Sequence, residues 1–287
     1  MERQPLGADA PQFLTQPPDS LAGWVQAFDT RELPVLRDSA LLLEDLRLVE
    51  EEVDAHTIAD GIGDDPLMTL KLLRHVAQLR KPATREHSDA ETTVEALVML
   101  GITPFFRHFG PQPTIEERLR AQPLALLGLR NVLSRASRAA RFALGFAAHR
   151  LDHDAAVIHE AALLHDFTEL LLWAHAPTLA LEVTRRLEQD HDLRSVDAQR
   201  SVLNVTLGDL QQALMKRWHL PDLLVRISDD HASENAQVRN VQLAIRVARH
   251  SAHGWDNPAL PDDVDAIAQL LNLGTTPTWT LLHDLDR

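Results

Sequence analysis

The sequence predicts an all-α protein with two helical lobes, and three observations support this fold class. The chain is rich in the helix-favouring residues Leu, Ala, Arg and Glu, whereas aromatic residues make up 5% and tyrosine is absent. From residue 21 onwards apolar residues recur at helical spacing, and no alternating run is long enough to predict a sheet. Prolines, glycines and short acidic caps separate the periodic segments, as helix boundaries do.

The first half of the chain is expected to form a tail and an N-terminal helical lobe. Residues 1–20 are rich in proline and lack periodicity, which predicts a mobile tail. Residues 21–110 follow as the N-terminal lobe. Its clearest helix start is Asp64-Asp65-Pro66, where an N-cap precedes a proline in the first turn. The helices expected in this lobe cover residues 54–62, 66–80 and 93–100.

The second half is expected to form a larger helical bundle. Residues 111–123 lie in a polar stretch broken by prolines, and we interpret them as a linker between the lobes. The bundle then occupies residues 124–287. Its predicted helices cover residues 124–149, 154–175, 177–189, 195–218, 221–231, 238–253, 262–273 and 276–285.

Composition and charge exclude several classes of protein. The net charge of −14 argues against binding to nucleic acid or to an anionic membrane. One run could form a local basic patch, and we interpret it as the solvated face of a helix: Arg130, Arg135, Arg138 and Arg141. The chain has no cysteine, no apolar run long enough to cross a bilayer and no signal peptide, so we expect a cytoplasmic protein.

An adjacent His165-Asp166 pair is the strongest candidate for chemistry. It lies in the predicted helix 154–175, which is apolar on nearly every side and is therefore expected to be buried. A buried carboxylate needs a partner, so Asp166 requires an explanation. A zincin site does not provide it, because the second ligand of a His159-Glu160 motif would fall on Leu163.

In layout the chain resembles the HD superfamily of metal-dependent phosphohydrolases. In that superfamily a His-Asp pair on a buried helix joins a His from an earlier helix and an Asp from a later one. The resemblance would place these outer ligands at Ala136 and Arg249, neither of which is a metal donor here. A further position that is often His in relatives is Leu207. A catalytic metal site needs about three protein ligands, so the site is expected to be vestigial.

The loss of ligands is similar to that in the HDOD family, the HD-related output domains, and the resemblance covers about residues 26–285. The segments that carry it are Leu33-Pro34, 64–73 (DDPLMTLKLL), 95–101 (EALVMLG), 162–166 (ALLHD) and 214–221 (LMKRWHLP). Two loops depart from the family pattern, at residues 77–79 (AQL) and at Phe167-Thr168. The resemblance implies a bacterial signal-transduction module, with the second lobe an HD-like helical bundle.

We therefore expect a non-catalytic, cytoplasmic regulatory module that acts through a protein partner or a small signal molecule. No metal or other cofactor is expected, and His165 and Asp166 are interpreted as a vestigial pair. Because Arg249 replaces an expected acidic ligand, its guanidinium could stand where a cation would sit and neutralise Asp166. An ordinary surface arginine is the competing interpretation.

Two alternatives stay open. One is a divergent metal-dependent phosphohydrolase acting on a nucleotide or a cyclic nucleotide. It would need replacement ligands around the pair, for which the candidates are His159, Glu169, Asp230 and His231. The other is a sensor whose groove between the lobes binds a small molecule without chemistry.

Overall fold

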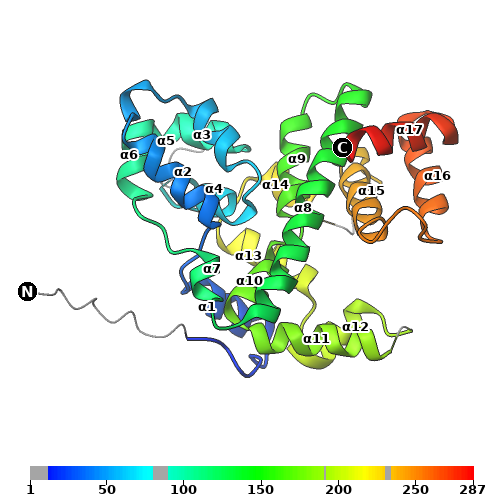
Figure 1. The fold of residues 1–287 in the computed structure, drawn as a ribbon, viewed down its shortest axis with the longest axis horizontal. Helices are drawn as coiled ribbons and strands as arrows, with labels where there is room; N and C mark the ends of the chain where they lie inside the picture. Colours follow the sequence, from blue (N-terminus) through cyan, green and yellow to red (C-terminus); the bar gives the residue numbers. More distant parts are fainter. Residues whose placement is uncertain (1–11, 80–89, 191, 230–233) are drawn as a thin grey trace, which may run out of the picture.

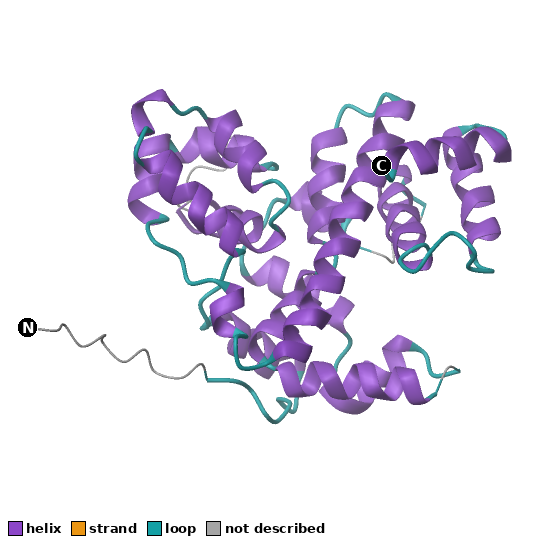
Figure 2. Ribbon diagram, in the orientation of Figure 1, coloured by secondary structure: helices purple, strands orange, loops and turns teal. Residues whose placement is uncertain are grey.

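The computed structural model describes residues 12–79, 90–190, 192–229 and 234–287, which are helical almost throughout (Figure 2). Within these ranges no strand is formed, and the one β-type pairing is an isolated bridge between Val35 and Thr114. The all-α fold class is therefore confirmed. In the same ranges, no helix combines the length and the apolar character that crossing a bilayer requires.

The first helices begin where the sequence supplies an N-cap. Ser20, Asp54, Thr92 and Thr114 each accept a hydrogen bond from a main-chain N–H in the first turn of the helix that follows. Gly101 separates two helices with a φ of +83°, which only glycine adopts readily. The elements are α1 (Leu21–Asp29), α2 (Arg37–Arg47), the short 3₁₀ helix η1 (Glu50–Glu52), α3 (Ala55–Ile62), α4 (Pro66–Leu79), α5 (Thr93–Leu100), α6 (Ile102–His108) and α7 (Ile115–Arg118).

The second half contains more helices than the sequence predicts. The predicted helix 154–175 is broken at His165-Asp166, and the predicted helix 195–218 is broken at Asn204, whose φ is +64°. Thr206 then caps the next helix by accepting from the Asp209 N–H. The elements are α8 (Pro123–Arg150), α9 (Ala155–Leu164), α10 (Phe167–His175), α11 (Pro177–Gln189), α12 (Ser195–Leu203), α13 (Leu207–Arg217), α14 (Asp222–Ile227), α15 (Ala236–His250), α16 (Leu260–Leu271) and α17 (Thr275–Leu285).

The helix α8 is the central helix of the second lobe, against which most of the other helices pack. It has 28 residues, which corresponds to a length of about 42 Å. Helices α9, α10 and α15 pack along it, and α16 and α17 cover its C-terminal half (Figure 1). Helices α2 to α6 form a separate lobe at the left of the same view. The buried apolar side chains of both lobes nevertheless belong to one continuous core.

The helix α1 lies with the second lobe, although the sequence analysis assigned it to the N-terminal one. It packs against α13, and the Trp24 indole N–H donates to the Leu203 carbonyl at 2.7 Å. Part of the predicted tail is also held, because the Leu14 N–H donates to the His175 carbonyl at 2.8 Å. Residues 1–11 lie outside the described residues.

The predicted linker 111–123 is structured. It contains α7, and it pairs with the segment through which the chain enters the N-terminal lobe. The Val35 N–H donates to the Pro113 carbonyl at 3.0 Å, and the Ile115 N–H donates to the Val35 carbonyl at 2.9 Å. The entry and exit segments of the N-terminal lobe therefore run side by side.

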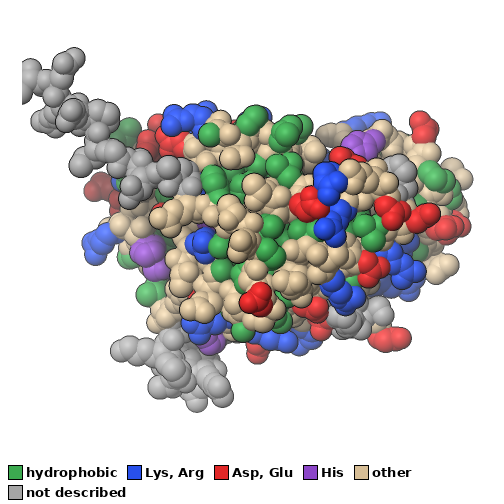
Figure 3. Space-filling view, turned by 90° about the horizontal axis from the view of Figure 1, so that it is seen from below, with side chains coloured by type: hydrophobic (Ala, Val, Ile, Leu, Met, Phe, Trp, Pro, Cys, Tyr) green, Lys and Arg blue, Asp and Glu red, His purple; other side chains and the backbone are tan. Residues whose placement is uncertain are grey.

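The surface carries charges of both signs. On the face seen from below, acidic and basic side chains are interspersed, and hydrophobic side chains lie exposed between them (Figure 3). Exposed hydrophobic side chains are a normal part of the surface of folded proteins.

Candidate functional site

The His165-Asp166 pair forms the junction between α9 and α10. The Asp166 carbonyl accepts the Glu169 and Leu170 N–H groups and so starts α10 after the turn. On either side of the pair, Leu164 and Phe167 are completely buried, which fixes the junction in the core. The two polar side chains keep small exposed fractions, 14% for His165 and 13% for Asp166. The sequence predicted a pair inside one continuous helix, but the turn instead directs both side chains toward one side of the bundle.

The side chain of Asp166 is held by an arginine from α8. One carboxylate oxygen accepts from Nε of Arg135 at 2.8 Å and lies 2.7 Å from Nη2 of the same guanidinium. The other oxygen lies 3.0 Å from Nδ1 of His165. Arg135 also donates to Glu169, one turn along α10, at 2.6 Å. We call these four residues, His165, Asp166, Glu169 and Arg135, the junction network.

The charges of the junction network stabilise one another. Burial alone would raise the pKa of Asp166, but Arg135, His165 and Arg249 outweigh it and hold that pKa well below the usual range. Burial alone would lower the pKa of Arg135, but the Asp166 and Glu169 carboxylates raise it. At neutral pH the site therefore contains an ionised carboxylate bound to a permanently charged guanidinium.

Arg249 lies beside the same carboxylate. Its Nη2 is 3.8 Å from Asp166, and its side chain is half exposed. This placement is what the charge-replacement hypothesis requires, although the replacement itself remains a prediction. The closer cation is Arg135, which the sequence analysis placed on a solvated face. That interpretation is wrong for Arg135 and Arg138, since Arg138 forms an ion pair with Asp286 at 2.7 Å; Arg130 and Arg141 are exposed as predicted.

The residue that sequence reasoning missed is adjacent to a position it singled out. Ala136, the position expected for the first histidine ligand, is buried with 3% exposure, and Arg135 directly precedes it. The sequence did contain a signal for this role. An arginine next to an expected ligand position is a candidate ion-pair partner for an acid on the neighbouring helix. Leu207 is buried and lies at the start of α13.

The proposed replacement ligands do not all converge on the pair. Glu169 does reach the site, but there it binds Arg135. His159 faces the Asp64 side of the molecule, and burial lowers its pKa. Asp230 and His231 lie outside the described residues. Within the part of the chain that the structure describes, no three His, Cys, Asp or Glu side chains are grouped so as to hold a metal ion.

A cavity of about 610 Å³ opens beside the junction network, between α10, α11, α12 and α13. Its polar lining includes Gln199, Arg200, Asp209 and Gln212 in addition to the network itself. These groups donate and accept hydrogen bonds. The arrangement therefore suits binding of a polar group.

The chain is similar to known proteins in both sequence pattern and fold. The family model for the HDOD domain matches residues 33–233. The MmoQ response regulator from Methylococcus capsulatus is 18% identical, with a TM-score of 0.64, and the match covers 88% of this chain and 98% of that one.

A virulence factor (cj0248) from Campylobacter jejuni is 17% identical, with a TM-score of 0.63, over 93% of this chain and 98% of that one. At these identities the two structures show a shared fold. No curated protein matches the sequence.

Proposed function

The chain belongs to the HDOD domain family, and on that premise we propose that it is a non-catalytic module of bacterial signal transduction. It acts in the cytoplasm by binding a protein partner or a small ligand. The metal centre of catalytic HD proteins is replaced by the junction network. The observation that supports this proposal most directly is the position of the Arg135 guanidinium, which donates hydrogen bonds to Asp166 at 2.8 Å and to Glu169 at 2.6 Å.

The guanidinium competes with a metal ion for the same carboxylate. A divalent cation approaching Asp166 would meet the positive charges of Arg135 and Arg249 and would have to displace charge-assisted hydrogen bonds. Arg135 is the harder of the two to displace, because its side chain is 17% exposed and two carboxylates hold it. Without a bound metal ion there is no activated water for phosphoester hydrolysis.

A groove along α8 supports binding to a protein partner. The groove has a volume of about 760 Å³, and its lining includes Leu124, Leu127, Trp173 and Trp255. Leu124 and Leu127 are 64% and 57% exposed. Exposed apolar side chains that lie together in a groove form a surface that a protein partner could bury.

Metal analysis combined with a phosphodiesterase assay tests the non-catalytic role. We expect the purified chain to bind Mn²⁺ at well below one equivalent and to hydrolyse bis(p-nitrophenyl) phosphate no faster than buffer. The Asp166→Ala variant should behave in the same way. Stoichiometric metal together with turnover that Asp166→Ala abolishes would show a divergent phosphohydrolase instead.

Partner capture tests the binding role. A Leu124→Glu/Leu127→Glu variant should lose a partner that the unaltered chain retains. The matched control is Leu151→Glu, since Leu151 is 84% exposed but lies at the other end of α8. Equal retention by both variants would place the interface elsewhere.

A further inference from the structure

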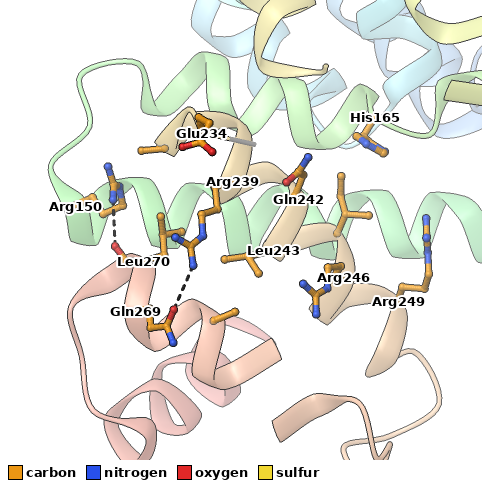
Figure 4. A pocket seen from close by; sticks show the side chains of 13 residues that line it. Arg150, His165, Glu234, Arg239, Gln242, Leu243, Arg246, Arg249, Gln269 and Leu270 are labelled. Carbon is orange, nitrogen blue, oxygen red and sulfur yellow. Dashed lines mark hydrogen bonds between the residues drawn. The ribbon is translucent and has the colours of Figure 1, made fainter. Parts of the chain in front are cut away.

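A second cavity, of about 750 Å³, lies on the other side of the α9–α10 junction, between α15, α16 and the C-terminal end of α8 (Figure 4). Its lining is unusually basic for a chain with a net charge of −14. Among the described residues, Glu234 is its one acidic lining residue. Four arginines line it: Arg150, Arg239, Arg246 and Arg249. We call these side chains the arginine pocket.

The periodicity of α15 accounts for most of this lining. Arg239, Arg246 and Arg249 are seven and three residues apart, so they follow one face of the helix, which Gln242 extends. The opposite face carries the buried residues Val241 and Ala248 and packs on α8. The core contact of α15 therefore turns the arginines into the pocket.

Two of these guanidinium groups have hydrogen-bonding capacity left. Arg239 makes one contact, at 3.4 Å to the side-chain oxygen of Gln269, and among the described residues no carboxylate lies within ion-pair distance of it. Within the described part of the chain, the one carboxylate within ion-pair distance of Arg249 is Asp166, at 3.8 Å, and Arg135 already binds that carboxylate. Each arginine therefore retains donors for an additional anion.

The other two arginines are paired but remain at the wall of the pocket. Arg246 forms an ion pair with the buried carboxylate of Asp263 at 2.5 Å, and Arg150 forms one with Asp152 at 3.1 Å. Each of these pairs is locally neutral. Arg249 balances the junction network, in which one guanidinium faces the two carboxylates of Asp166 and Glu169. Arg239 is therefore the arginine of the pocket whose charge no ion pair among the described residues compensates. Arginine presents several N–H donors in a planar fork that matches the geometry of phosphate.

We propose that the arginine pocket binds a small phosphorylated molecule that carries at least two phosphate groups and is about the size of a nucleotide. Arg239 and Arg249 are separated by ten residues, or about 15 Å along the axis of α15. Two anionic groups in one ligand match two guanidinium groups at this spacing better than a single orthophosphate does. Leu243 lies between Arg239 and Arg249 on α15 and lines the pocket, and an uncharged part of the ligand would lie against it. This inference rests on the proposed function, because the ligand is bound without being cleaved.

Calorimetric titration of the full chain tests the site. The probes are inorganic tripolyphosphate and adenosine triphosphate, with EDTA present, and orthophosphate serves as the single-anion comparison. We expect saturable binding of one equivalent of tripolyphosphate and at least tenfold weaker binding of orthophosphate. Arg239→Gln and Arg249→Gln should each weaken tripolyphosphate binding about tenfold or more, the effect typical of a lost charged hydrogen bond.

The matched control is Arg141→Gln, which removes the same charge from an exposed position on α8 outside the pocket. It should change the affinity by less than about threefold, since it alters only the long-range field. Arg239→Gln is expected to keep the melting temperature of the unaltered chain, because the one hydrogen bond of Arg239 to another described side chain is long, at 3.4 Å. Absence of saturable binding, or equal weakening by Arg239→Gln and Arg141→Gln, would refute the arginine pocket as a site.

The two proposals fail in different ways. Phosphate release is measured on the titrated samples after Mg²⁺ or Mn²⁺ is added in excess of the EDTA. Binding that is followed by metal-dependent phosphate release would overturn the non-catalytic role while leaving the binding site in place. A chain that neither binds tripolyphosphate nor releases phosphate would overturn the arginine pocket alone.

Discussion

Removing the guanidinium of Arg135 is the most direct perturbation of the junction network. In Arg135→Met the apolar stem of the side chain is retained, but Asp166 and Glu169 lose their shared cation. Glu169 is 31% exposed and can be hydrated, whereas Asp166 is 13% exposed and cannot be hydrated fully. The main cost is therefore an uncompensated carboxylate at the point where α9 meets α10.

The magnitude follows from that burial. Breaking a buried ion pair by deleting one partner costs about 3–5 kcal/mol. Arg249, at 3.8 Å, offsets part of this by moving closer to Asp166. We therefore expect Arg135→Met to lower the free energy of unfolding by about 3 kcal/mol. For a chain of 287 residues this corresponds to a decrease in melting temperature of roughly 5 °C.

Urea denaturation followed by circular dichroism measures this loss. The control is Arg130→Met, because Arg130 is exposed on the same helix and its substitution should change stability by less than about 0.5 kcal/mol. The double variant Arg135→Met/Asp166→Asn should recover part of the loss, since no unpaired charge is left buried. A loss below about 1 kcal/mol in Arg135→Met, or no recovery in the double variant, would refute the view that the ion pair holds the junction.

Three further predictions concern other buried groups. Burial lowers the pKa of His175 to about 3, below the value near 6.5 in the unfolded chain, so the unfolded state takes up the proton first. The free energy of unfolding should therefore fall by about 2 kcal/mol when the pH is lowered from 7 to 5. In His175→Leu this pH-dependent decrease should be absent from urea titrations at the two pH values. Gly128→Ala would place a Cβ 2.5 Å from the ring of Trp173, and should cost about 1–3 kcal/mol. In the same thermal scans Gly208→Ala, with nothing within 4 Å of the new Cβ, should be neutral or stabilising by up to about 1 kcal/mol. Trp24→Phe removes a 2.7 Å hydrogen bond to the end of α12 and should cost about 1–3 kcal/mol; an unchanged urea midpoint would contradict this.

The fold class and several helix starts could be predicted from local sequence. The helices that begin at Pro66 and Thr93 follow N-cap and proline signals that act within one turn, and the structure has them there. The breaks at His165-Asp166 and at Asn204 were missed. Neither carries a proline or a glycine, so hydrophobic periodicity continues through both. At Asn204 the signals are local, because asparagine can adopt a positive φ and Thr206 caps the next helix, but hydrophobic periodicity does not report them. At His165-Asp166 the chain turns without such a signal, and the bonds that hold the turn come from another helix, α8.

The structure brings together three residues that the sequence analysis singled out, but the cation closest to Asp166 was missed. The sequence drew attention to His165, Asp166 and Arg249 because they occupy positions expected for ligands. Arg135 was assigned to a solvated face because charge and spacing describe a helix without its neighbours. Only the packing of α10 against α8 brings its guanidinium to Asp166.

The paired segments at Val35 and at residues 113–115 carry a mechanical consequence. The chain enters and leaves the lobe of α2 to α6 through two stretches of main chain, and these stretches are hydrogen-bonded to each other. The two connections of the lobe therefore cannot separate without breaking both main-chain hydrogen bonds, so the start of the lobe and its end are held at the same place on the molecule.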